Sequence, residues 1–319
     1  MPFDAGESVL ADEEFALWVR SRRAAALLTQ EELAVRAAVS VRTIRNVEAG
    51  RAGRAHTRRL VVMALADLPL QPSAAPAPEM VPAQLLPDVP AFTGRSTELR
   101  ALDEHLATAT AICLLCGPAG VGKTALAVHW GHRVRDAFPD GQLYADLRGS
   151  APGPGPATTD ILAAFLRALG VPGNDMPQEP DERAARYRTL LAGRRMLVVL
   201  DDIASADQIR PLLPGTPRCP VLATGRGRLA DLVVRYGAHR IGLGPLAPTD
   251  ALRLLRTLVG DRVGADRHGA TALAERCGRL PLPLRAAAEA ALTHPTLPLS
   301  AVDVGPVAAD ARGTGPQLR

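Results

Sequence analysis

The sequence predicts an α/β fold in which helices flank a parallel sheet, with an all-helical unit before the sheet and a second small helical unit after it. Apolar runs typical of buried strands alternate with amphipathic stretches of helical period from residue 92 onward. Before residue 69 only the helical period is present, and the segment 69–91 is rich in proline. Such alternation of strands and helices is typical of a sheet whose strands run in one direction.

The composition is that of a globular chain of about two domains. The 319 residues are 47% hydrophobic, and 37 basic residues against 33 acidic ones give a net charge of +4. This excess permits an acidic partner without forming a polybasic tail. The acidic N-terminus lacks the positive region of a secretory signal, and no apolar run reaches the roughly 18 residues of a membrane helix. We therefore expect a cytoplasmic protein without a membrane partner.

Changes in composition divide the chain into five segments. Proline stiffens the backbone between the helical part and the α/β part, and few groups there could form a core, so we expect a linker. The last residues show no periodicity, which predicts a disordered tail. The expected boundaries are a helical domain at 1–68, the linker at 69–91, an α/β domain at 92–245, a helical subdomain at 246–295 and the tail at 296–319.

The stretch GPAGVGKT, from Gly117 to Thr124, contains the only lysine of the chain. It fits the pattern G-x-x-x-x-G-K-[ST] between an apolar strand and a helical stretch, the context that a phosphate-binding loop requires. Glycines at this spacing let backbone N–H groups face phosphate oxygens, and the helix N-terminus adds positive potential. A compact ammonium enters such a loop better than a guanidinium does. We therefore predict a nucleotide-binding P-loop formed by Gly117, Gly120, Val121, Gly122, Lys123, Thr124 and Ala125.

A second motif follows at the end of another predicted strand. The run MLVVLDD, from Met196 to Asp202, ends in two aspartates, which is the arrangement of a Walker B motif. We expect Asp201 to hold Mg²⁺ together with Thr124, while Lys123 contacts the β- and γ-phosphates. Asp202 is expected to orient or polarise the attacking water, and capping of the next helix is the alternative for it.

A third strand signal completes the predicted catalytic set. The run VLATGR, from Val221 to Arg226, is apolar and ends in polar groups. In P-loop sheets whose sensor strand lies between the P-loop strand and the Walker B strand, this end faces the γ-phosphate, so Thr224 and Arg226 are candidate sensors. We expect slow hydrolysis of ATP to ADP at most, with Lys123, Asp201, Asp202 and Arg226 as the catalytic residues.

The N-terminal segment predicts two short helices joined by a tight turn. Thr29 and Glu32 form a capping box at the start of TQEELAVRAA, and Ser40 caps VRTIRNVE. In the second helix the apolar residues repeat every three positions and point inward, which leaves arginine, threonine and asparagine outward. Such a face can donate to phosphates and read base edges. A bundle used for protein contacts is the alternative.

These helices and the AVS turn, with LWVRSRRAAAL before and TRRLVVMALADL after, resemble the helix-turn-helix of the XRE or Cro/repressor family. Ala38 stands where such turns commonly hold a left-handed glycine, and alanine there costs on the order of 1 kcal/mol. One such domain binds DNA weakly, so we expect a homo-oligomer on a DNA operator. The resemblance implies that Gln30 touches phosphate and that the major groove receives Ser40, Arg42, Thr43 and Arg45.

The ordered set FTGR, GPAGVGKT, FPDGQLYADLRG, LLAGRRMLVVLDD, VLATGR and CGRLPLPL resembles the NB-ARC ATPase of the STAND class, in its bacterial regulator form, from about Phe92 to His294. The resemblance implies a P-loop NTPase sheet and a small helical subdomain with ADP or ATP between them. It also implies that Arg95 lies near the adenine and that Pro281 packs against it. The family continues into a winged-helix domain and signal-receiving repeats, so the end at Arg319 suggests a truncated form.

The expected function is therefore that of a STAND-type transcriptional regulator. Its cofactors would be ADP or ATP with Mg²⁺, and its helix-turn-helix would bind DNA. The alternative is a protein-interaction scaffold that carries ADP and has no DNA-reading role. A metabolic ATPase or kinase is disfavoured because the chain has no signature for an acceptor substrate. The signal partner is not predicted by any motif.

Overall fold

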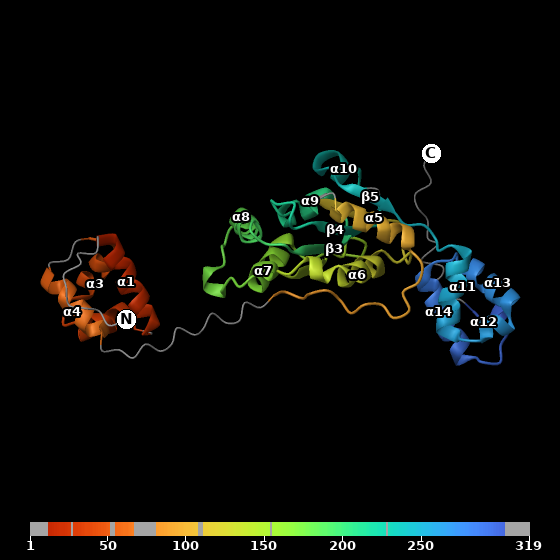
Figure 1. Cartoon of the computed structure of the whole chain (residues 1–319), viewed down its shortest axis with the longest axis horizontal. Helices are drawn as coiled ribbons and strands as arrows, with labels where there is room; N and C mark the ends of the chain where they lie inside the picture. Colours follow the sequence, from red (N-terminus) through yellow and green to blue (C-terminus); the bar gives the residue numbers. More distant parts are fainter. Residues whose placement is uncertain are drawn as a thin grey trace. The chain divides into compact units, whose positions relative to one another are not determined.

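The computed structural model divides the chain into two compact units, residues 1–79 and 80–319 (Figure 1). Among the helices that the structure describes, none is both long and apolar enough to cross a membrane. The described residues are 12–26, 28–51, 55–66, 81–107, 111–153, 155–227 and 229–303.

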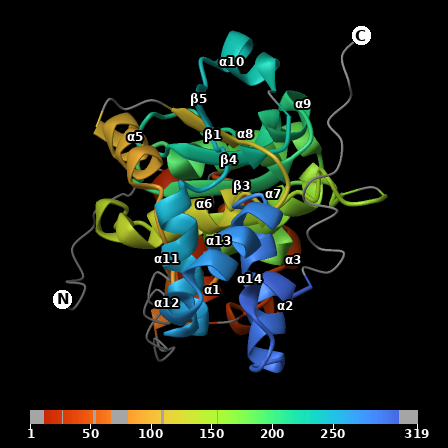
Figure 2. The ribbon, with the colours of Figure 1, turned by 90° about the vertical axis from the view of Figure 1, so that its right-hand side faces the viewer.

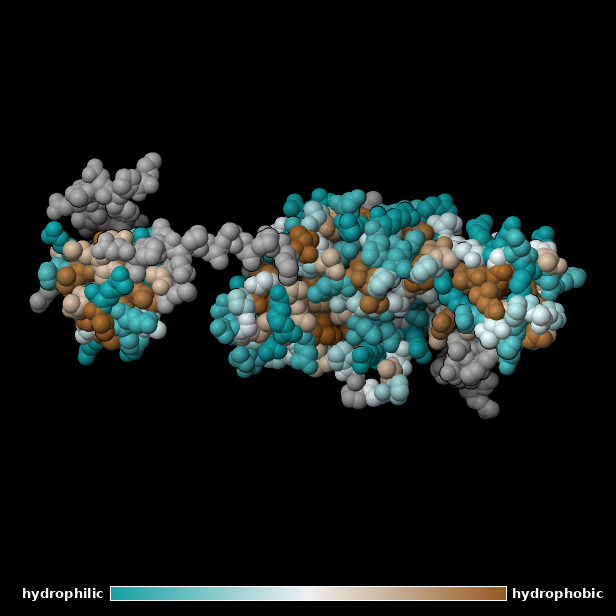
Figure 3. Space-filling model, turned by 90° about the horizontal axis from the view of Figure 1, so that it is seen from below, coloured by the Kyte–Doolittle hydropathy of each residue, from teal (hydrophilic) through white to brown (hydrophobic). Residues whose placement is uncertain are grey.

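The first unit is helical. Thr29 and Glu32 form both hydrogen bonds of the predicted capping box, and Ser40 caps the following helix as predicted. Between the two helices Ala38 has a φ of 51°, the left-handed conformation expected at this position. Separate hydrophobic areas lie among hydrophilic ones on the described surface of this unit (Figure 3). Its helices are α1 (Asp12–Ala25), α2 (Gln30–Arg36), α3 (Val41–Glu48) and α4 (Ala55–Ala66).

The described residues of the second unit form a parallel sheet with the strand order β2-β3-β4-β1-β5. The predicted sensor strand β4 pairs with the P-loop strand β1 on one side and the Walker B strand β3 on the other, as expected. The carboxyl ends of these three strands therefore meet at one edge of the sheet. The strands are β1 (Ile112–Cys116), β2 (Gln142–Asp146), β3 (Leu197–Ile203), β4 (Val221–Gly225) and β5 (His239–Gly242).

Helices cover both faces of the sheet (Figure 1). Because side chains alternate along a strand, Leu115 of β1 packs with α5 and α6, while Leu114 packs with α7 and α8 on the opposite face. This produces the predicted parallel sheet with flanking helices. The elements are α5 (Ser96–Ala107), α6 (Lys123–Arg133), α7 (Thr158–Ala168), α8 (Pro180–Leu191), α9 (Ala206–Ile209) and α10 (Ala230–Tyr236), with 3-10 turns η1 (Arg135–Ala137), η2 (Gly173–Asp175) and η3 (Arg210–Leu212).

A helical subdomain with its own core follows the sheet (Figure 2). Residues 296–303, which we expected in a disordered tail, belong to this core because Leu299 and Val302 are buried there. Arg276 also donates to the carbonyl of Val302. The rest of the predicted tail, 304–319, lies outside the described residues. The elements are α11 (Pro248–Val259), α12 (Arg262–Ala265), α13 (Arg267–Arg276), α14 (Pro281–Thr293) and η4 (Leu299–Ala301).

Part of the predicted linker also packs on the α/β unit. The Gln84 N–H donates to the Gln142 carbonyl over 3.1 Å, and the Gln142 N–H donates to the Pro82 carbonyl over 2.7 Å. These bonds satisfy backbone groups of β2 on its outer side, where no other strand of the described sheet pairs. We call residues 81–92 the strap. The preceding part of the predicted linker, 69–80, lies outside the described residues.

Candidate functional site

A cleft of about 480 Å³ lies at the carboxyl ends of the central strands, within the size range of ligand pockets. The P-loop, the two Walker B aspartates and the start of α14 contribute to its walls. The structure thus brings together most of the residues predicted to bind nucleotide and metal. Those that line the cleft are Gly120, Gly122, Lys123, Thr124, Ala125, Asp201, Asp202, Thr224, Arg226 and Pro281.

The P-loop has the backbone that its glycines permit. Gly122, the N-cap of α6, has a φ of 94°, in the left-handed region that side chains disfavour. A Cβ at Gly117 would lie 2.5 Å from the Leu243 carbonyl oxygen, so no larger residue fits there. These two positions let the chain turn tightly from β1 into α6. The N-terminus of α6, with its free N–H groups, is therefore directed at the cleft.

The single lysine is largely buried in this loop. Lys123 is 9% exposed, and its Nζ donates to the carbonyl oxygens of Gly117 over 3.0 Å and Pro118 over 2.9 Å. Burial lowers the pKa of Lys123, and the charge of Arg226 lowers it further, whereas Asp202 and Asp201 oppose both effects. The ammonium is thus a donor that two carbonyls hold at the base of the cleft.

Asp201 is the centre of a network of hydroxyl groups. The Thr124 Oγ1 lies 2.9 Å from both of its carboxylate oxygens, and the Thr224 hydroxyl donates to Oδ1 over 2.5 Å. Thr224 Oγ1 also accepts the Asp202 N–H over 2.9 Å, so its one proton is directed at Asp201. In this structure Thr224, predicted as a γ-phosphate sensor, therefore orients the Asp201 carboxylate.

Tyr144 completes this network and was not predicted from the sequence. Its hydroxyl donates to Asp201 Oδ2 over 3.1 Å from the neighbouring strand β2. Burial raises the pKa of the Tyr144 hydroxyl, and the Asp201 charge raises it further, so the tyrosine remains a donor. The signal in the sequence is a tyrosine two residues before the end of the strand QLYAD.

The oxygen atoms of Thr124 and Asp201 are suitable ligands for Mg²⁺. Thr124 and Asp201 supply hard oxygen ligands close together, and Mg²⁺ typically takes one or two protein ligands while keeping waters and phosphate oxygens. Within the described ranges no group of three or more His, Cys, Asp or Glu residues could hold a metal by itself. The pair is therefore suited to a metal that arrives with a nucleotide.

Asp202 is held by the turn that follows β2. Its Oδ2 accepts the Ser150 N–H over 2.9 Å and the Ser150 hydroxyl over 2.5 Å, and its φ is 51°. Ser205, rather than Asp202, caps the next helix α9, so the capping alternative for Asp202 is wrong. Ser150 also lines the cleft and was missed, because nothing in the sequence indicates that this turn contacts β3.

A smaller cavity of about 40 Å³ adjoins the cleft and shares Pro281 with it. Arg95 and Val121, both predicted to bind nucleotide, line this cavity. Arg95 is 8% exposed, and its guanidinium donates to the carbonyls of Val121 over 2.9 Å and Gly244 over 2.7 Å. Arg95 therefore ties the segment before α5 to the P-loop, while Pro281 begins α14 at the same cavity.

Arg285 is a further cation at both cavities that sequence reasoning missed. It lies four residues after Pro281 in α14 and donates to the carbonyl oxygen of Pro90 and, over 3.5 Å, to that of Ala91. The helical subdomain is thereby joined to the strap beside the cleft. The only available signal was an arginine one helical turn from the predicted Pro281.

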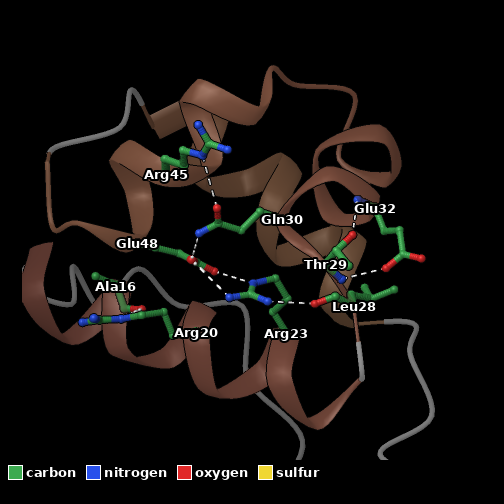
Figure 4. A network of polar contacts seen from close by, with 9 residues as sticks. All are labelled: Ala16, Arg20, Arg23, Leu28, Thr29, Gln30, Glu32, Arg45 and Glu48. Atoms are coloured by element: carbon green, nitrogen blue, oxygen red, sulfur yellow. Dashed lines mark hydrogen bonds and ion pairs between the residues drawn. The ribbon is translucent and has the colours of Figure 1, made fainter. Parts of the chain in front are cut away.

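The residues predicted to contact DNA differ in how they are held. Gln30 donates to Glu48 over 2.6 Å and accepts from Arg45 over 3.3 Å (Figure 4). The hydroxyl groups of Ser40 and Thr43 lie 2.8 Å apart at the start of α3. Arg42, which is also exposed, makes no hydrogen bond or ion pair with any described residue.

Sequence reasoning missed the pair that anchors α3 to α1. Arg23 Nε donates to Glu48 Oε1 over 2.6 Å, and Glu48 is 6% exposed (Figure 4). Burial raises the pKa of Glu48, but hydrogen bonds from Arg23 and Gln30 and the Arg23 charge outweigh it and leave that pKa below its ordinary value. Glu48 is thus a buried carboxylate held by fixed donors.

The chain is similar in sequence to regulatory proteins of Streptomyces. The regulatory protein AfsR of Streptomyces griseus is 48% identical over 226 residues, which are 68% of this chain and 23% of AfsR. AfsR of Streptomyces coelicolor is 45% identical over 235 residues, or 70% of this chain and 23% of AfsR. The chain thus spans less than a quarter of the length of these curated relatives.

Solved structures and a family model also match. The Aeropyrum pernix ORC2 protein aligns with a TM-score of 0.46 and 17% identity, covering 70% of this chain and 69% of that one. The family model described as the NB-ARC domain matches residues 95–263, which are more than half of the chain. The chain belongs to the NB-ARC family.

Proposed function

We propose that this protein is a transcription regulator whose second unit binds ADP or ATP with Mg²⁺ and whose first unit binds DNA. The observation that supports it most directly is that the P-loop lysine and the Thr124–Asp201 pair line the same cleft. The names of the AfsR relatives support a regulatory role. The proposal assigns nucleotide binding to residues 92–303 and DNA binding to residues 1–68.

In the nucleotide site each group has a physical task. The N–H groups at the start of α6 bind phosphate oxygens, and the Lys123 ammonium neutralises their charge. Thr124 and Asp201 hold Mg²⁺, which neutralises further phosphate charge when it is bound. Arg226 is an exposed cation at the edge of the cleft and would face the terminal phosphate. The adenine would lie where the cleft adjoins the smaller cavity, toward Arg95 and Pro281.

Hydrolysis in this site would be slow and would serve as a switch. The hydroxyl and N–H of Ser150 fix Oδ2 of Asp202, which leaves Oδ1 as the carboxylate oxygen that can orient a water. Polar groups in the site are already hydrogen-bonded to one another, so ATP must replace some of these bonds as it binds. The two nucleotides would then favour different conformations of the unit, in proportion to their difference in affinity.

In the first unit we assign α2 and α3 to an XRE-type helix-turn-helix, with α3 as the helix that enters the major groove. Arg42 is exposed and has no partner among the residues that the structure describes, so its donors could reach a base edge or a phosphate. The Arg45–Gln30 hydrogen bond holds two further side chains together, so that they would contact DNA as a unit with Ser40 and Thr43. Two copies of the chain would bind one operator.

The test separates the two activities. Mass spectrometry of the purified protein after gentle denaturation should release ADP or ATP, and calorimetry with Mg²⁺ should show nucleotide binding. Selection from a random duplex library should yield a preferred DNA sequence. Arg42→Ala should weaken binding to that DNA by about 1–3 kcal/mol, as expected for the loss of one base contact.

The matched control is Arg186→Ala, which removes the same charge from an exposed position of α8 in the second unit. It should leave DNA affinity unchanged in a fluorescence anisotropy titration. An unchanged isotherm for Arg42→Ala would contradict the assignment of α3. Recovery of ADP without any selected DNA would instead support the protein-interaction scaffold.

A further inference from the structure

The strap, residues 81–92, continues the sheet and then runs along the P-loop helix α6. Its first residues pair with the edge strand β2 through the Gln84–Gln142 and Gln142–Pro82 backbone hydrogen bonds. The Gln84 side chain also accepts the Tyr144 N–H over 3.3 Å. Tyr144 is the residue whose hydroxyl donates to Asp201 in the cleft. The strap therefore contacts the strand that supports the Walker B aspartate.

The middle of the strap is fitted to α6. Leu85 packs in the core beneath α6, where a Cβ added at Gly131 would lie 2.7 Å from its Cδ1. The Leu86 carbonyl lies 2.8 Å from His132 Nε2, and the Asp88 carboxylate lies 3.0 Å from His129 Nδ1. These contacts lie within about one turn of the helix, at residues 129–132. A glycine at position 131 is thus explained by the space that the strap occupies.

The end of the strap forms part of the nucleotide cleft. Val89 lines both the cleft and the smaller cavity. The next two carbonyls accept from Arg285 of α14, and the Phe92 ring stacks on His129 with centroids 4.0 Å apart. A molecule that fills both cavities therefore touches the strap, the P-loop and α14 together. Its contacts with Val89 exist only while the strap is in place.

We propose that the strap is a positioning element of the nucleotide site that closes on α6 when nucleotide binds and opens when it leaves. The proposal rests on the proposed nucleotide binding. A ligand that contacts the closed strap shifts the equilibrium between open and closed strap toward the closed state. By linkage, the closed state binds the ligand more tightly than the open state by the same factor as the ligand shifts that equilibrium. Measurements of nucleotide affinity and of strap opening therefore report the same coupling free energy between nucleotide binding and strap closure.

Opening of the strap would also change the length of chain between the N-terminal unit and the α/β unit. The strap follows that unit in the sequence, so each of its residues released from α6 lengthens the chain between the two units. Release of residues 81–91 adds up to about 36–40 Å of extended chain. The proposal thereby links the nucleotide to the length of strap that is available between the proposed DNA-binding residues and the α/β unit.

The test uses two neighbouring leucines of the full-length protein. Leu85→Asp places a charge in the apolar contact with α6, whereas Leu86→Asp places the same charge on a side chain that is already 43% exposed. Hydrogen exchange of the Gln84 and Gln142 amides reports strap opening, because each is bonded across the strap–β2 junction. Calorimetry with ADP and Mg²⁺ reports affinity.

In the wild type, saturating ADP should slow exchange of both amides by about tenfold, within the usual range of coupling between sites. Leu85→Asp should weaken ADP binding by the same factor, and Leu86→Asp should leave it unchanged. Circular dichroism controls for unfolding of Leu85→Asp. If wild-type protein binds ADP but exchange does not slow and the two variants bind ADP equally, the strap proposal is overturned while nucleotide binding stands. If wild-type protein binds no nucleotide, both proposals fail.

Discussion

Lys123 in the cleft is 9% exposed and donates to two carbonyls, whereas Arg42 on α3 is exposed and has no partner among the described residues. In the cleft, Asp201 and Asp202 are likewise held by hydroxyl and N–H donors of the protein. A change in the cleft would therefore orphan buried partners as well as removing a proposed ligand contact, whereas a change at Arg42 would remove the proposed contact alone. The cleft should be the more sensitive site.

The largest effect that would confirm this contrast is expected from Lys123→Ala. The substitution removes the charge that would face the phosphates and leaves the carbonyls of Gly117 and Pro118 without their donor. ADP affinity should fall by about 100-fold, or roughly 3 kcal/mol, since hydrogen bonds to charged groups are the strong ones. Calorimetry measures the loss, and circular dichroism checks the fold.

The control for this experiment is Lys123→Arg, which keeps the charge. The broad guanidinium does not fit a position that is 9% exposed, so we expect it to restore little of the affinity. Full affinity in Lys123→Arg would show that charge alone matters. Tight ADP binding by Lys123→Ala would contradict the view that this lysine holds the phosphates.

Glu48 tests whether the first unit contains a buried polar site of its own. Removal of one partner from its ion pair with Arg23 leaves a poorly compensated charge, so Glu48→Gln should lower the free energy of unfolding by about 2 kcal/mol. Urea unfolding followed by Trp18 fluorescence in a Trp130→Phe background measures it. Glu31→Gln, at an exposed position of α2, is the control and should change little.

The same carboxylate predicts a pH dependence. Because folding lowers the pKa of Glu48 from its ordinary 4.5, its contribution to stability is present above that pH and is lost as pH falls further through the folded pKa. Stability of the first unit should therefore drop below about pH 4.5 in the wild type and less steeply in Glu48→Gln. Equal slopes in both proteins would exclude Glu48 as the titrating group.

The sequence predicted those parts of the molecule that depend on neighbours along the chain. The caps at Thr29 and Ser40 and the strand–loop–helix around Lys123 are local patterns, and the structure has each of them. Local spacing was sufficient for these features. The position of the sensor strand between the P-loop and Walker B strands was instead expected from P-loop sheets in general, and β4 lies there.

Contacts between distant segments could not be predicted in this way. Tyr144 and Ser150 reach the Walker B aspartates from residues more than fifty positions earlier, and no pattern in either segment specifies that contact. The strap was misjudged for a related reason. The proline content indicates how stiff a segment is. It does not indicate whether a side chain such as Leu85 packs on an apolar surface of another segment, as Leu85 does beside Gly131.

The smallest predicted effect concerns the backbone before α3 rather than its polar face. Ala38 has a φ of 51°, so Ala38→Gly should relieve strain and, after the extra entropy of the unfolded glycine, raise the free energy of unfolding by about 0.5–1 kcal/mol. Ala37→Gly, at a φ of −83° and buried, should lower it. Urea unfolding of both variants measures the difference. DNA affinity should not follow this gain, because Arg42 stays exposed in either case; a parallel rise in affinity would mean that the turn, and not the exposed arginine, limits binding.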